Sequence, residues 1–144
     1  MECMEVFIIK LLELCSCNWL TVNFNPICTK NIFTDLDELI IIWCKFSDVS
    51  KDSCINMIWK NPKRQNVITI PVKINKSTTE EPVRRAWTVM ETKAANILNN
   101  CYGNWNVEIS EDDNILGEIN FDFRNIKSKT LSTNSNSIMM NITI

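Results

Sequence analysis

The chain has 144 residues, of which 45% are hydrophobic and 22% charged, with a formal net charge of −2 and no histidine. This length fits one domain with a substantial core, and the small net charge gives no general attraction to nucleic acid or anionic lipid. Because histidine is the commonest general base and metal ligand, its absence leads us to expect no catalytic, cofactor-binding or metal site.

Seven cysteines, an odd number, exclude complete pairing within the chain. None of them has the Cys-x-x-Cys spacing that zinc sites commonly use. Glu2 and Glu5 stand where a signal peptide carries basic residues, and no apolar run reaches the roughly 18 residues of a membrane-spanning helix. We therefore expect a soluble chain with free thiols, which favours an intracellular location.

Residues 1–18 are predicted to form an amphipathic helix. Over residues 2–16 the apolar side chains recur at spacings of three and four, at Met4, Phe7, Ile8, Leu11, Leu12 and Cys15. We expect this helix to dock on the domain's own core. An interface with a partner, or peripheral attachment to a membrane through residues 2–16, is the alternative, although the acidic polar face argues against lipid.

From residue 19 to residue 123 the spacing changes to that of β-strands. Strands are expected at 19–24, 38–46, 55–60, 67–74, 83–92, 105–110 and 118–123, with a loop over 25–37. The continuous apolar run at 38–46 is typical of a central strand buried on both faces. Pro71 cannot donate a ladder hydrogen bond, so its strand should lie at an edge. Residues 91–99 have the better propensity for a short helix.

The last two of these strands form the clearest element. Trp105, Val107 and Ile109 alternate with polar residues, and after an acidic turn at 111–114 Phe121 and Phe123 do the same. This pattern predicts an antiparallel hairpin with one apolar and one acidic-polar face. Residues 124–144 read as a flexible polar tail, in which the apolar run 138–144 could add a short strand.

This hairpin resembles the end of small immunoglobulin-like β-sandwich domains of bacteria and archaea, often attached to surface or envelope proteins. The matching positions are Gly103, Trp105, Val107, Ile109, Leu116, Gly117 and Phe121, and the likeness covers residues 38–123. The resemblance implies an all-β, antiparallel sandwich of about seven strands that is non-catalytic. Cys44 and Cys101 have a spacing around Trp59 compatible with an immunoglobulin disulfide, but Asn99 stands where a tyrosine is expected.

Two basic clusters and one tryptophan are the predicted partner-binding residues: Lys63, Arg64, Arg84, Arg85 and Trp87. Trp43, Trp59, Trp87 and Trp105 fall within predicted strands of the matching region 38–123. A sandwich core holds two or three such rings comfortably, so one could be exposed and mark an interaction face. We select Trp87 because two arginines precede it. The alternatives are solvated edge charges that discourage aggregation, and a core that takes all four rings.

The sequence thus predicts a protein-interaction or structural module whose partner is another protein. The acidic turn at 111–113 lacks the ligand spacing of a calcium loop and is expected to be solvated. A small-ligand-binding protein, or an enzyme that uses carboxylates without histidine, is the alternative function. A pocket with converging carboxylates would favour that alternative, and a flat polar surface would oppose it.

Overall fold

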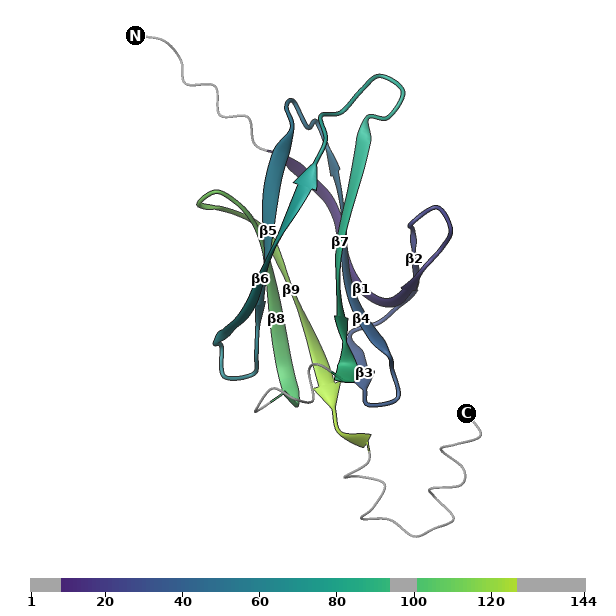
Figure 1. Cartoon of the computed structure of the whole chain (residues 1–144), viewed down its shortest axis with the longest axis vertical. Helices are drawn as coiled ribbons and strands as arrows, with labels where there is room; N and C mark the ends of the chain where they lie inside the picture. The colour runs from purple at the N-terminus through teal and green to yellow at the C-terminus, as the bar shows by residue number, and fades with distance from the viewer. Residues whose placement is uncertain (1–8, 94–100, 127–144) are drawn as a thin grey trace.

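The computed structural model describes residues 9–93 and 101–126, which form two packed β-sheets (Figure 1). The four-stranded sheet has the order β2-β1-β4-β7, from β1 (Lys10–Leu20), β2 (Pro26–Thr29), β4 (Leu39–Ser47) and β7 (Val83–Glu91). The five-stranded sheet has the order β3-β9-β8-β5-β6, from β3 (Ile32–Thr34), β5 (Ser53–Lys60), β6 (Asn66–Ile74), β8 (Gly103–Glu111) and β9 (Asn114–Arg124). The all-β sandwich is confirmed, with nine strands in the described residues.

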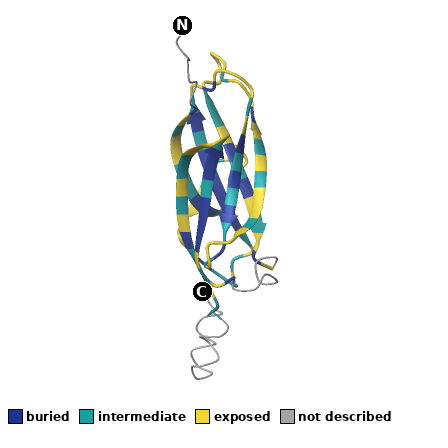
Figure 2. Cartoon of the chain, turned by 90° about the vertical axis from the view of Figure 1, so that its left-hand side faces the viewer, coloured by how far each residue is buried: buried dark blue, intermediate teal, exposed yellow. Residues whose placement is uncertain are grey.

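The core lies between the two sheets. Trp105 stacks on Phe121 at a centroid distance of 6.0 Å, and Trp59 meets the same ring edge-on at 5.9 Å. Figure 2 shows the buried residues concentrated in the central strands, with exposed residues at the edges and loops. Thr88 joins the sheets inside this core: Trp59 Nε1 donates to Thr88 Oγ1 at 3.2 Å, and the Thr88 hydroxyl donates to the Met57 sulfur at 3.2 Å.

Several strand predictions are confirmed. β4 is an inner strand of its sheet and buried over Ile40–Cys44, and β6 with Pro71 lies at an edge. In the final hairpin Trp105 faces Phe121, and Asp112 turns the chain with a φ of 52°. Cys44 is a free thiol, so the immunoglobulin-type disulfide to Cys101 is absent.

The predicted amphipathic helix is wrong for residues 10–18, which belong to β1; residues 1–8 lie outside the described part. The register of β1 against β4 passes from Leu11↔Phe46 directly to Glu13↔Lys45, so Leu12 is an extra, bulged residue. The bulge separates the inward side chains Leu11 and Leu14 by three residues, which imitates a helical period. Membrane attachment through a helix at 2–16 loses its basis with this correction.

β1 and β9 also approach each other closely across the sandwich. A Cβ atom added at Gly117 would lie 2.6 Å from Cδ2 of Leu11, so a larger residue at this position would require the leucine side chain to shift.

Two further predictions about the region before β4 are wrong. The strand expected at 19–24 ends at Leu20, and the expected loop at 25–37 contains the short strands β2 and β3. β3 pairs in parallel with β9, far along the chain, and β2 pairs with the end of β1. The helix expected near 91–99 and the tail after 126 fall largely or wholly outside the described residues.

Candidate functional site

The outer face of the four-stranded sheet carries a second, smaller apolar cluster. Trp43 of β4 lies in one row with Cys15 of β1 and Trp87 of β7. Although it points away from the main core, Trp43 is only 1% exposed. The loop 21–25 covers it, because Trp43 Nε1 donates to the carbonyl oxygen of Phe24 at 2.8 Å. The Phe24 ring then stacks on Trp87, with centroids 4.9 Å apart and planes 15° apart.

A hollow of about 230 Å³ opens beside this stacked pair, between the loop 21–25 and the adjoining ends of β6 and β7. We call it the basic–aromatic hollow, and its lining includes Phe24, Lys73, Arg84, Arg85 and Trp87. Phe24 is 53% exposed, and Lys73 and Arg85 are exposed as well. An apolar ring surface and two accessible cations therefore border the same small space.

The two arginines of this hollow differ in how fully their guanidinium groups are hydrogen-bonded. Arg84 holds the β6–β7 loop, since its Nε and Nη2 donate to the carbonyl oxygen of Lys76 at 3.2 and 2.6 Å and its Nη1 pairs with Glu81 at 3.2 Å. Arg85 donates one hydrogen bond, from Nε to Asn25 Oδ1 at 3.0 Å. The guanidinium of Arg85 thus keeps further donors for a ligand.

The structure brings only part of the predicted partner-binding set together. Arg84, Arg85 and Trp87 share the hollow, whereas Lys63 and Arg64 lie in the β5–β6 turn at the opposite end of the sandwich (Figure 1). There Arg64 Nη2 donates to Asn104 Oδ1 at 3.0 Å.

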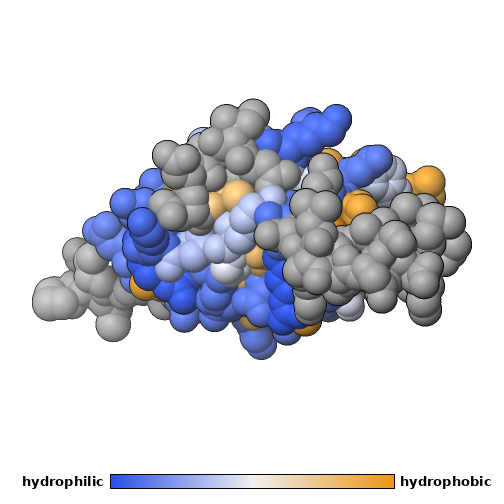
Figure 3. Space-filling view, turned by 90° about the horizontal axis from the view of Figure 1, so that it is seen from below, coloured by the Kyte–Doolittle hydropathy of each residue, from blue (hydrophilic) through white to orange (hydrophobic). Residues whose placement is uncertain are grey.

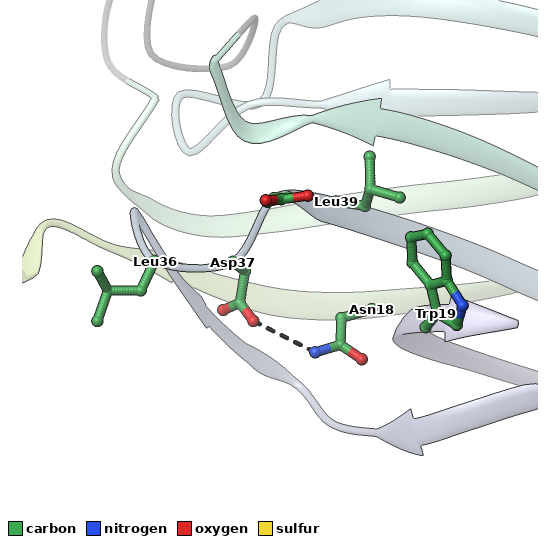
Figure 4. Close-up of a pocket in the computed structure, with 6 residues that line it drawn as sticks. Asn18, Trp19, Leu36, Asp37 and Leu39 are labelled. Atoms are coloured by element: carbon green, nitrogen blue, oxygen red, sulfur yellow. Dashed lines mark hydrogen bonds between the residues drawn. The ribbon is translucent and has the colours of Figure 1, made fainter. Parts of the chain in front are cut away.

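Sequence reasoning missed Phe24 and Lys73. The exposed Trp19 was missed too, and it borders a hollow of about 220 Å³ between the end of β1 and the start of β4 (Figure 4). In this view Trp19 and Leu39 lie beside each other and Leu36 points away. Asn18 Nδ2 donates to Asp37 Oδ1 at 3.5 Å across the opening.

Carboxylates gather at the end of the sandwich where β7 finishes. Asp35, Asp37, Glu38 and Glu91 line an open hollow of about 470 Å³, and the described surface is mostly hydrophilic from this side (Figure 3). Asp37 is already engaged, through an ion pair with Lys30 and a 2.9 Å hydrogen bond from the Thr34 amide. Asp35 Oδ1 accepts a hydrogen bond from the Tyr102 hydroxyl at 2.8 Å. Two of these carboxylates therefore hold the β3–β4 loop.

Cys15 and Cys44 are not activated nucleophiles. Burial raises the pKa of the Cys44 thiol to about 12 and that of Cys15 to about 11, which disfavours the reactive thiolate. Cys28 and Cys54 are exposed. Over residues 9–93 and 101–126, no three Cys, Asp or Glu side chains are grouped so that they could hold a metal ion.

No helix within the described residues is long and apolar enough to cross a membrane. No protein-family model matches the chain, and no curated protein matches it.

Solved structures do resemble it. An immunoglobulin-like protein from Pseudomonas aeruginosa superposes with a TM-score of 0.52 at 14% identity, covering 81% of this chain and 97% of that one. The alkylpurine DNA glycosylase AlkC from Pseudomonas fluorescens, solved bound to DNA containing an abasic site analog, gives 0.54 at 10% identity. That match covers 81% of this chain but 30% of the glycosylase. At these identities the likeness concerns the fold alone, and the chain has an immunoglobulin-like β-sandwich fold.

Proposed function

We propose that the chain is a non-catalytic protein-interaction module of immunoglobulin-like type that binds an acidic segment of another protein in the basic–aromatic hollow. The observation that carries the proposal is the stacked Phe24–Trp87 pair with Lys73 and Arg85 beside it. An exposed aromatic surface next to accessible cations is the combination that interaction hot spots favour.

The chemistry of the hollow favours a carboxylate-bearing ligand. Lys73, Arg84 and Arg85 line it against one carboxylate, Glu81, which is already paired with Arg84. The uncompensated charge is therefore positive, and Arg85 can still offer donors in the fork geometry that matches a carboxylate. The faces of the two rings can bury an apolar side chain that neighbours the acid.

The size and shape of the hollow support a peptide contact over catalysis. About 230 Å³ is below the usual range of small-molecule sites and holds one or two side chains. The lining contains no thiol or hydroxyl nucleophile, and its single carboxylate is engaged. The hollow can therefore bind and orient a group, but it has no evident means of transforming one.

Selection from a random peptide display library on the reduced chain tests this function. We expect the enriched peptides to carry Asp or Glu next to an apolar residue. Binding of a labelled, selected peptide should weaken by about 10- to 100-fold in Lys73→Glu, since a charge-assisted contact becomes a repulsion. Phe24→Ala should also weaken it, through loss of the ring surface.

Lys63→Glu is the matched control, because it makes the same charge change on an exposed lysine at the other end of the sandwich. It should leave the affinity within about twofold, since screening removes most of its effect at that separation. Equal loss in Lys63→Glu and Lys73→Glu, or enriched peptides without acidic residues, would contradict the proposal.

A further inference from the structure

The two sheets end in four edge strands, and three of them are protected against pairing with another chain. β2 and β3 are only four and three residues long. β6 contains Pro71, and its register against β5 shifts beside Trp59. β7 is different: it has nine residues, no proline, and an unbroken register against β4 from Leu39↔Glu91 to Ser47↔Val83. A long, regular edge of this kind is a template for a further strand.

The backbone groups that β7 presents outward can be identified. The Thr92 amide donates to the carbonyl oxygen of Glu38 at 3.0 Å, which marks this pair as hydrogen-bonded. Because such pairs alternate in an antiparallel ladder, the N–H and C=O groups of Arg85, Trp87 and Val89 point away from β4. No other strand of the described chain pairs with β7, and β6 comes close only near the connecting loop (Figure 1).

The side chains on this edge are self-complementary. Arg85 and Glu91 stand at equal distances along the chain on either side of Thr88, and so do Trp87 and Val89. All four belong to the outer face, and Val89 is 44% exposed. A twofold axis at Thr88 would place each arginine opposite a glutamate and each tryptophan opposite a valine. Opposite charges and aromatic–β-branched pairs are both favourable across antiparallel strands.

We propose that the strand added to this edge is β7 of another copy of the chain, paired in antiparallel register about Thr88. The outward-pointing residues then face one another, and four such pairs exchange about eight backbone hydrogen bonds. The two four-stranded sheets become one continuous sheet. The charges at Arg85 and Glu91 select this register and disfavour others, because any shift brings a charge opposite an apolar or like-charged residue. This assembly is a property additional to ligand binding in the basic–aromatic hollow.

Sedimentation equilibrium of the full chain tests the assembly. The protein is kept reduced, so that disulfides through exposed Cys28 or Cys54 cannot link copies, and is followed up to about 1 mM. We expect a monomer–dimer equilibrium. Arg85→Glu should raise the dimer dissociation constant by about 30-fold, because two attractive cross-strand pairs become repulsive. Glu91→Arg should have a similar effect.

The double variant R85E/E91R restores opposite charges in the same register and should bring the dissociation constant back to within about threefold of the original. A merely structural role of either residue would not give this rescue. Lys73→Glu, which makes the same charge change on β6, is the control and should leave the dimer intact.

A chain that stays monomeric throughout overturns the proposal, and so does a dimer that R85E leaves unchanged or the double variant fails to restore. The two proposals fail separately: Lys73→Glu weakens peptide binding without affecting the dimer, whereas Glu91→Arg weakens the dimer without affecting peptide binding.

Discussion

Thr88 provides the sharpest test of how the two sheets are held together. Its Oγ1 accepts a hydrogen bond from the indole N–H of Trp59 at 3.2 Å and lies 3.2 Å from the Met57 sulfur. Both contacts lie in the core between the sheets. Thr88 is 5% exposed and Trp59 0%. Thr88→Val keeps the shape of the side chain but removes the acceptor, so the indole N–H stays buried with no partner.

The expected cost follows from that stranded donor. Leaving a buried polar group unsatisfied costs about 1–3 kcal/mol, so we expect Thr88→Val to lower the free energy of unfolding by about 2 kcal/mol. In a domain of this size that corresponds to a fall in Tm of roughly 6–10 °C. Thermal and urea unfolding, followed by circular dichroism, should both report the change.

A double-mutant cycle separates this hydrogen bond from general packing. Trp59→Phe removes the donor, so in that background Thr88→Val strands nothing and should cost less than about 0.5 kcal/mol. Equal costs of Thr88→Val with and without the indole would show that the loss comes from packing alone and not from the hydrogen bond.

Three further predictions concern the turn, the thiols and alkaline stability. Asn61→Ala should lower the free energy of unfolding in urea by about 2–3 kcal/mol, because the Asn61 side chain accepts hydrogen bonds from two backbone amides of the β5–β6 turn at 3.0 Å each and is 5% exposed. A loss under about 0.5 kcal/mol would contradict this. Alkylation mapped by mass spectrometry should modify exposed Cys28 and Cys54 well before buried Cys44, and the reverse order would exclude this burial. Burial holds the pKa of Cys44 at about 12 against 9.0 in the unfolded chain, so the unfolded thiol ionises first and stability falls as the pH rises from 9.0 toward 12. Cys44→Ala should show a shallower fall over that range, and an unchanged slope would argue against the shift.

The alternation of apolar and polar residues predicted the strands that pair with a neighbour in the sequence. The β8–β9 hairpin is continuous in sequence, with an apolar face and a tight turn at Asp112, so its two strands follow from the local sequence, whereas the register shift between Ile109 and Ser110 does not. The outer side of this hairpin is less exposed than a solvated face suggests, since Asn106 is 7% exposed and its Nδ2 donates to Asn120 at 3.0 Å. β5 pairs with β8 in the same sheet and sets Lys60 opposite Asn106, a neighbour that the alternation within the hairpin cannot reveal.

The wrong predictions have two physical causes. In β1 a single bulged residue, Leu12, moves the apolar positions out of step and gives a helical spacing to a strand. β2 and β3 are too short to show an alternation of apolar and polar residues. β3 forms only because its backbone pairs with β9, which lies far along the chain. Long-range pairing of this kind leaves no mark on a local pattern.

The candidate site was half predictable for the same reason. Arg84, Arg85 and Trp87 are neighbours in sequence, and the cluster of cations beside a tryptophan was visible there. Phe24 and Lys73 come from a loop and a strand that meet Trp87 only through the fold. No feature of the sequence near Phe24 indicates that its carbonyl oxygen and ring will cover two tryptophans.

The most direct test of the account is a two-dimensional ¹H–¹⁵N titration of the reduced chain with a selected acidic peptide. If the basic–aromatic hollow binds the partner, the largest shifts should fall on the amides of Phe24 and Lys73 and on the side-chain N–H groups of Arg85 and Trp87. Shifts confined to the β5–β6 turn around Lys63, or spread evenly over every basic residue, would contradict it.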